Sequence, residues 1–204
     1  LAEILKGAHI PIPETVIVTR DNRGQALEVL GLPCVLKLPD SSFSLGVVKT
    51  STQEEFLAET DRMLGSSDLL IAQEFIPTEF DWRIGVLEGR ALFACKYFMA
   101  RDHWQIYDWA STKSRPVSGS WETVAVADAP PVIVATALQA SRLVGDGLYG
   151  VDLKYVDGRP IVIEINDNPS IESGVEDAVL GPETYAAVMR SLRRRVEARA
   201  RGAP

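Results

Sequence analysis

The stretch Gly150–Pro169, with the sequence GVDLKYVDGRPIVIEINDNP, decides the fold of this chain. The Asp-Gly-Arg turn signal at 157–159 separates two runs in which apolar residues alternate with polar ones. This pattern predicts a β-hairpin whose odd-numbered residues pack and whose even-numbered residues face a site. If the turn is a three-residue loop, Asp152 lies directly opposite Glu164, and Asn166 follows on the same face.

Two opposed carboxylates on this hairpin require a positive charge between them. Directly opposed side chains lie about 4.5–5.5 Å apart at Cβ, and like charges at that distance destabilise the sheet. Lys154 would neutralise them in a salt-bridged hairpin, but it does not explain the neutral oxygen of Asn166 beside Glu164. Mg²⁺, or the similarly hard Mn²⁺, takes such oxygen ligands and leaves room for phosphate oxygens. The sequence therefore favours a metal site formed by Asp152, Glu164 and Asn166.

The composition is that of an ordinary globular protein and excludes several functional classes. The chain has 204 residues, 46% of them hydrophobic and 24% charged, and its net charge is −7. That negative charge argues against a nucleic-acid partner, because such proteins usually carry a basic surface. The sequence contains neither a long apolar run nor a secretory leader, so we expect no membrane segment. Cys34 and Cys95 lie in apolar runs, which predicts reduced thiols and a cytoplasmic protein.

The rest of the chain mixes helical and strand patterns, which predicts an α+β fold. A capping box at Ser51-x-x-Glu54 opens one helix. We expect helices at 2–9, 22–30, from 51 to about 64, 131–144 and 182–199, and strands at 15–19, 34–38, 46–50, 69–72, 81–87 and 91–99.

Two further segments have alternative interpretations. The segment 100–119 combines aromatic and basic residues, which is typical either of a substrate loop or of an aromatic-pinned surface loop. In the last helix, apolar residues from Tyr185 to Val196 occupy the face opposite the arginines around Arg194. The arginines form either a solvated helix face, which this pattern favours, or a basic binding surface.

Four motifs, in this order, resemble those of the ATP-grasp superfamily and, within it, the RimK-type glutamate ligases. The motifs lie at Lys37 with its strand, at 73–76, at 81–83, and at Asp152 with 164–169. The resemblance covers essentially the whole chain and implies an ATP-grasp fold, with two α+β lobes and the nucleotide cleft between them. The lobes would span residues 1–75 and 76–204. The phrase at 103–107 is closest to a bacterial branch that carries an extra N-terminal domain.

The resemblance also implies a role for each motif residue. Asp152, Glu164 and Asn166 would hold two Mg²⁺ ions, and Arg83, Lys96 and Arg115 would act on the anionic substrate or intermediate. A structural Asp81–Arg83 ion pair and a solvated Lys37 are the alternatives from the residues alone. The residues implied for ATP binding are Lys37, Ser41, Ser42, Ser44, Gln73, Glu74, Phe75, Ile76 and Asp81.

The implied reaction is ATP-dependent ligation of a carboxylate to an amine through an acylphosphate, as in peptide or amino-acid ligation. A non-catalytic or regulatory ATP-binding module is one alternative, because Gly46 is the only glycine near the expected phosphate loop. Phosphorylation of a carboxylate without ligation is another. The start at Leu1, inside a predicted helix and without Met, indicates a fragment of a longer polypeptide. The acid and the amine are not specified by the sequence, and an oligomer is left open.

Overall fold

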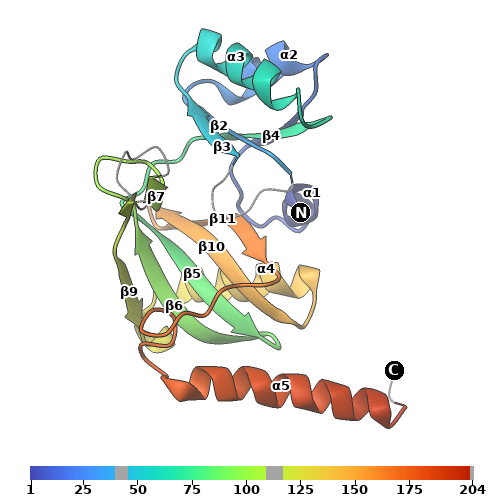
Figure 1. The fold of residues 1–204 in the computed structure, drawn as a ribbon, viewed down its shortest axis with the longest axis vertical. Helices are drawn as coiled ribbons and strands as arrows, with labels where there is room; N and C mark the ends of the chain where they lie inside the picture. Colours follow the sequence, from blue (N-terminus) through green and yellow to red (C-terminus); the bar gives the residue numbers. More distant parts are fainter. Residues whose placement is uncertain (40–45, 109–116, 203–204) are drawn as a thin grey trace. The chain divides into compact units, whose positions relative to one another are not determined.

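The computed structural model describes residues 1–39, 46–108 and 117–202, and it confirms the expected α+β class. Within these ranges, helices and strands alternate along the chain in much the expected order (Figure 1). None of the described helices is both long and apolar enough to cross a membrane. The chain divides into two compact units.

One unit consists chiefly of residues 12–77 and contains a four-stranded antiparallel sheet in the order β1-β4-β2-β3. Helices α2 and α3 pack on this sheet, and the fully buried Phe56 and Leu36 belong to the core between them. The elements are β1 (Thr15–Val18), α2 (Arg23–Leu30), β2 (Cys34–Lys37), β3 (Val47–Thr50), α3 (Gln53–Met63) and β4 (Leu70–Glu74).

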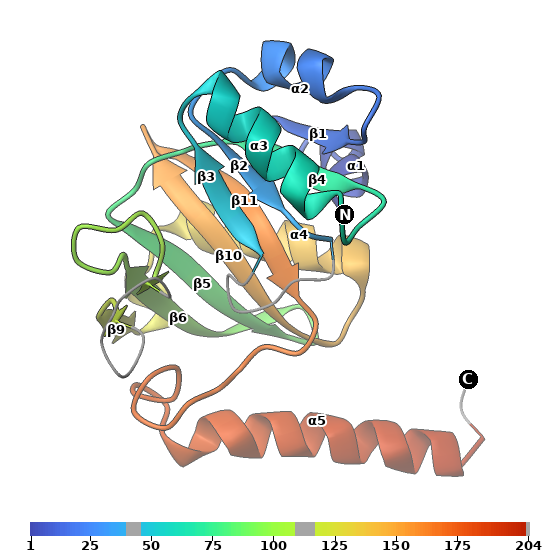
Figure 2. The same cartoon turned by 45° about the horizontal axis from the view of Figure 1, so that its top comes forward.

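The other unit consists chiefly of residues 3–11 and 78–204, and its described part contains a five-stranded antiparallel sheet in the order β11-β10-β5-β6-β9. Helix α4 covers one face of this sheet with the buried Ile133 and Ala137 (Figure 2). Its elements are α1 (Ala2–Gly7), β5 (Phe80–Leu87), β6 (Arg90–Phe98), β7 (Tyr107–Asp108), β8 (Val117–Ser118), β9 (Trp121–Val124), η1 (Val126–Asp128), α4 (Pro131–Val144), β10 (Leu148–Val156), β11 (Arg159–Asn166) and α5 (Pro182–Ala200).

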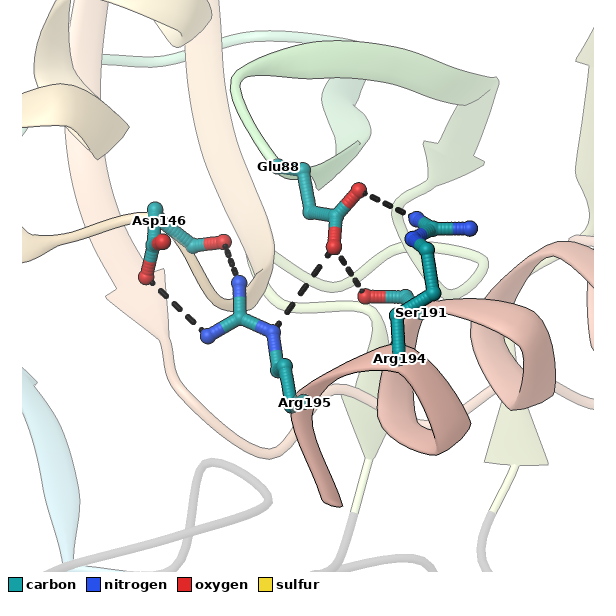
Figure 3. Close-up of polar contacts among 5 residues, drawn as sticks. All are labelled: Glu88, Asp146, Ser191, Arg194 and Arg195. Atoms are coloured by element: carbon teal, nitrogen blue, oxygen red, sulfur yellow. Dashed lines mark hydrogen bonds and ion pairs between the residues drawn. The ribbon is translucent and has the colours of Figure 1, made fainter. Parts of the chain in front are cut away.

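Helix α5 is attached to the rest of its unit through its arginine-bearing side (Figure 3). Glu88, in the β5–β6 turn, accepts hydrogen bonds from Ser191 at 2.6 Å and Arg194 at 2.7 Å. These hydrogen bonds, with that from Ser191 first, lower the pKa of the Glu88 carboxyl. Arg195 donates to the carboxylate of Asp146 at 3.1 Å and to its backbone carbonyl at 2.6 Å. Two acidic groups on neighbouring turns therefore anchor the basic side of the helix.

The apolar side of α5 lies at the surface, and Arg193 and Arg194 are exposed too, as the solvated-face interpretation of the arginines predicts. Met189, Leu192 and Val196 are exposed, and Val196 exposes 68% of its surface. Glu88 and Asp146 pair with Arg194 and Arg195, and these pairs were not predictable from the helical pattern.

The start of α3 contains a capping box, shifted by one residue from the expected position. Thr52 accepts a hydrogen bond from the Glu55 amide at 3.1 Å, and the Glu55 carboxylate accepts one from the Thr52 amide at 3.3 Å. Both Ser51 and Thr52 fit the sequence pattern, because Glu54 and Glu55 are both three residues further on. The backbone enters the helix at Gln53, which makes Thr52 the capping residue.

We expect Thr52→Ala to lower the free energy of unfolding by about 1 kcal/mol, because it leaves the Glu55 amide without its capping acceptor. Urea unfolding followed by helical circular dichroism measures this change. Ser51→Ala is the matched control and should leave the free energy unchanged within about 0.5 kcal/mol. Equal losses in the two variants would contradict the assignment of Thr52 as the cap.

Candidate functional site

The hairpin of β10 and β11 places Asp152 directly opposite Glu164, as expected from the sequence. The expected three-residue turn is wrong, because Val156 pairs with Arg159 across a two-residue turn. Both turn residues have positive φ angles, 51° at Asp157 and 76° at Gly158, as in the tight turns that match strand twist.

A β-bulge restores the predicted opposition. The register of the hairpin shifts between Asp152 and Leu153, so that Leu153 pairs with Val162 whereas Asp152 pairs with Glu164. The extra residue on β11 compensates for the shorter turn. It also changes which side chains pack, because Val162 is buried while Ile161 and Ile163 are only partly so.

Arg83 on β5 lies beside Asp152 on β10 and binds it through two hydrogen bonds. Its Nε donates to Oδ1 at 2.7 Å and its Nη2 to Oδ2 at 2.8 Å, and the two side chains are 20% and 18% exposed. Burial alone would lower the pKa of the Arg83 guanidinium, but the charge of Asp152 and its hydrogen bonds outweigh burial and raise it. The pair is therefore a bidentate fork of two short hydrogen bonds.

Asn166 joins this pair from the end of β11. Its Nδ2 donates to Oδ2 of Asp152 at 3.3 Å. An ionised carboxylate has about four acceptor positions, and Arg83 and Asn166 use three of those on Asp152. One acceptor position of Asp152 remains, with the exposed carboxylate of Glu164 across the hairpin.

These oxygen donors fit a magnesium site of limited strength. Among the described residues, no group of three or more His, Cys, Asp or Glu side chains lies together as a metal site. Asp152 and Glu164 provide only two carboxylates, and Asn166 adds a neutral oxygen. Mg²⁺ is typically held by one or two carboxylates together with substrate phosphates and waters. We therefore expect metal binding here to depend on a phosphate ligand.

A second ion pair lies next to the first on the same two strands. Lys154 donates to Oδ1 of Asp81 at 2.7 Å and to Thr78 Oγ1 at 2.7 Å, and the lysine and aspartate side chains are 13% and 19% exposed. Burial raises the pKa of the Asp81 carboxyl, and Lys154 opposes that rise. Asp81 pairs with Lys154 and Arg83 with Asp152, so neither the alternative Asp81–Arg83 pair nor Lys154 between Asp152 and Glu164 describes this structure.

Lys96 lies on the other face of the sheet from Arg83. It is paired with Trp82, the neighbour of Arg83 on β5, and side chains of adjacent residues point to opposite faces. Its ammonium donates to Glu122 at 2.8 Å and lies 5.4 Å from the ring centre of Trp82. The structure therefore does not bring Lys96 to the face that carries Arg83 and Asp152, and Arg115 lies outside the described residues.

Except for Asp81 on β5, the residues implied for nucleotide binding that the structure describes belong to the unit of residues 12–77. Lys37 ends β2 and Glu74 ends β4, and because these neighbouring strands are antiparallel, the two residues lie at opposite ends of the pair. Gln73 is buried and donates to Thr15 Oγ1 at 3.0 Å, so its amide already has a structural partner. Phe75 follows Glu74, and the Lys49 ammonium lies 4.6 Å from its ring centre.

The expected nucleotide site also includes Ile76 and three serines of the loop between β2 and β3. Ile76 follows Phe75 and is partly buried. Ser41, Ser42 and Ser44 lie outside the described residues. Gly46, the first described residue after them, has a positive φ of 73°, which glycine adopts readily. Its carbonyl accepts a hydrogen bond from the Leu38 amide at 3.1 Å, next to the ends of β2 and β3.

Sequence reasoning missed two residues that contact the Arg83 network. Tyr97 lies under the Arg83 guanidinium, with 5.1 Å from Cζ to the ring centre, and the Tyr97 hydroxyl donates to the buried carboxylate of Glu176. Glu176 lies 93 residues after Arg83 in the sequence, so no local spacing connects the two residues. The acid-rich segment Glu172–Asp177 was the only signal available for it.

Comparison with solved structures establishes the class: the chain has the ATP-grasp fold. The D-alanine–D-alanine ligase from Bacillus anthracis matches with a TM-score of 0.75 and 17% identity over 96% of this chain and 67% of that one. The same ligase complexed with ATP matches with a TM-score of 0.74. A RimK domain ATP-grasp protein from Sphaerobacter thermophilus matches with a TM-score of 0.61 and 20% identity, over 87% of this chain and 62% of that one.

Sequence comparison then points to a particular group within this class. A probable α-L-glutamate ligase from Syntrophotalea carbinolica is 28% identical over 180 residues, which cover 86% of this chain and 56% of the relative. A probable α-L-glutamate ligase from Teredinibacter turnerae is 29% identical over 180 residues, which cover 86% of this chain and 56% of that relative. The chain thus spans about half the length of these relatives. No family model matches it. The resemblance to RimK-type glutamate ligases is confirmed.

Proposed function

We propose that this chain is the ATP-grasp module of an ATP-dependent carboxylate–amine ligase that joins amino acids or peptides. The observation that carries the proposal is the arrangement on β10 and β11, where Asp152 opposes Glu164 beside Asn166 and is bound by Arg83. The named activity of the glutamate ligase relatives supports the reaction class.

ATP and Mg²⁺ are the proposed cofactors. The ATP complex of the D-alanine–D-alanine ligase supports the nucleotide. Asp152, Glu164 and Asn166 would hold magnesium, which when bound supplies charge neutralisation at the phosphates. Lys37 contributes a point charge to the phosphates, and Glu74 an acceptor for the ribose or the adenine edge. The backbone of Phe75 and Ile76 forms hydrogen bonds with the adenine base.

Arg83 is the proposed residue for the reacting anions. A guanidinium has five N–H donors, and Asp152 uses two of them, so the others can hold the acid carboxylate or the transferred phosphoryl group. Its 20% exposure leaves a route to solvent. The acid carboxylate attacks the γ-phosphorus and ADP leaves, after which the amine displaces phosphate from the acylphosphate. Roles for Lys96, Arg115, Asp81, Gln73 and the three serines stay predictions.

We further propose that the substrates are a small-molecule or peptide carboxylate and an amine, and that the reaction takes place in the cytoplasm. The names of the ligase relatives support the substrates. The two buried free cysteines, Cys34 and Cys95, support a reducing compartment, and burial raises the pKa of both thiols. An oligomer is compatible with this proposal.

Trapping with hydroxylamine tests the proposed reaction. The chain is incubated with Mg·ATP, hydroxylamine and each of a panel of amino acids and short peptides, and hydroxamate and ADP are measured. We expect at least one acid to give a hydroxamate in proportion to ADP, and Arg83→Lys to lower its rate at least about 100-fold because lysine lacks the planar fork. ADP release without hydroxamate would contradict the acylphosphate. ATP binding without ADP release for any acid would indicate a non-catalytic module.

A further inference from the structure

Glu176 is a fully buried carboxylate outside the residues that the proposed function uses. It lies between β11 and α5 and is only 1% exposed. One oxygen accepts a hydrogen bond from the Tyr97 hydroxyl, and the other accepts from the Glu172 amide at 2.8 Å. A buried carboxylate is costly unless it is well paired, so this arrangement calls for an explanation beyond loop closure.

Tyr97 connects Glu176 to the Arg83–Asp152 pair. Its ring lies 5.1 Å from the Arg83 Cζ, within the range of a cation–π interaction. Burial and then the hydrogen bond to Glu176 raise the pKa of the Tyr97 hydroxyl, which keeps it a donor at neutral pH. Glu176, Tyr97, Arg83 and Asp152 therefore form one continuous chain of contacts, which ends at a proposed magnesium ligand.

The segment that carries Glu176 is itself fixed to the sheet. Thr123 on β9 donates to the Val175 carbonyl at 2.7 Å, and the Trp121 indole donates to the Gly174 carbonyl at 3.2 Å. Val175 packs against the buried Phe93 and Cys95. These contacts hold the segment on the face of the sheet that carries Tyr97, independently of the Glu176 carboxylate.

We propose that Glu176 is a positioning residue: through Tyr97 it holds the Arg83 fork on Asp152, so that the remaining acceptor of Asp152 is presented to a cation. This inference rests on the proposed function. The hydrogen bond from the Tyr97 hydroxyl to Glu176 fixes the position of the ring under the guanidinium. Without that hydrogen bond the ring can shift, and the Arg83–Asp152 pair loses the support on that side. The fold survives such a change, because the packing of Val175 and the Thr123 bond are unaffected.

The test measures how much Mg²⁺ the chain needs to bind ATP. At fixed ATP, calorimetric titrations over a range of Mg²⁺ concentrations give the metal concentration for half-maximal binding. We expect Tyr97→Phe and Glu176→Gln each to raise it about 10-fold, as is typical of residues that orient metal ligands. Val175→Ala is the structural control: it should lower the melting temperature and leave the Mg²⁺ requirement unchanged.

A double-mutant cycle checks the route through the guanidinium. In an Arg83→Lys background, Tyr97→Phe should change the Mg²⁺ requirement less than twofold, because the fork it positions is already absent. An equal shift in both backgrounds, an equal shift from Val175→Ala, or no shift from either positioning variant would overturn the proposal while Mg²⁺-dependent ATP binding persists. If ATP binding to the wild-type chain does not depend on Mg²⁺, the proposed function is refuted, and the positioning role with it.

Discussion

Replacement of Glu164 by glutamine is expected to weaken the binding of Mg·ATP at least about 100-fold, because it removes one of the two carboxylates that we assign to the metal among the described residues. At a ligand concentration 100 times the wild-type dissociation constant, binding stabilises the wild type by about 2.7 kcal/mol and the variant by about 0.4 kcal/mol. Thermal unfolding with and without Mg·ATP measures both values. The metal-free variant should match the wild type within about 0.5 kcal/mol, because Arg83 already neutralises Asp152.

Asp157→Asn is the matched control for this prediction. It removes a carboxylate from the same hairpin, at the turn, and asparagine tolerates the positive φ of that position. Its stabilisation by Mg·ATP should equal that of the wild type. Equal losses in Asp157→Asn and Glu164→Gln would mean that the hairpin acts through its net charge, which would contradict the placement of the metal at Glu164.

The second large effect is expected at the buried pair of Lys154 and Asp81. Lys154→Met should lower the free energy of unfolding by about 3 kcal/mol, because it leaves the buried Asp81 carboxylate without its ion pair and with the Thr78 hydroxyl as a hydrogen-bond donor. Urea unfolding followed by tryptophan fluorescence reports this change, since Trp82 is adjacent to Asp81 on β5.

Two comparisons make the second prediction specific. The double variant Lys154→Met with Asp81→Asn should lose clearly less than the sum of the two single variants, because the stranded charge is removed. Arg193→Met breaks an exposed ion pair with Glu197 on α5 and should cost no more than about 0.5 kcal/mol. Additive losses in the double variant would contradict the coupling of Lys154 to Asp81.

The hairpin shows how far local sequence patterns reach. Alternation and a turn signal were sufficient to place Asp152 opposite Glu164, although the turn has two residues and a bulge supplies the third. The bulge was not predictable, because Ile161, Val162 and Ile163 are all apolar, so that either register directs apolar side chains to the core.

Long-range partners were the part that the sequence left open. Spacing placed Asp81 and Arg83 on one face, but their partners, Lys154 and Asp152, come from β10 and depend on the register between strands. The anchors of α5, Glu88 and Asp146, were missed for the same reason, since they lie far from the helix in the sequence. Elements determined by local periodicity, such as α4 at 131–144, were predicted with their bounds.

Calorimetric titration of ATP into the wild-type chain, with and without Mg²⁺, tests the central claim most directly. The account predicts binding with Mg²⁺ present and at least about tenfold weaker binding in its absence, because the carboxylate of Glu164 repels the phosphates unless a cation lies between them. It also predicts that Mg²⁺ alone binds weakly, because the site needs phosphate oxygens. Equal ATP affinity under the two conditions would contradict a magnesium-dependent nucleotide site on this hairpin.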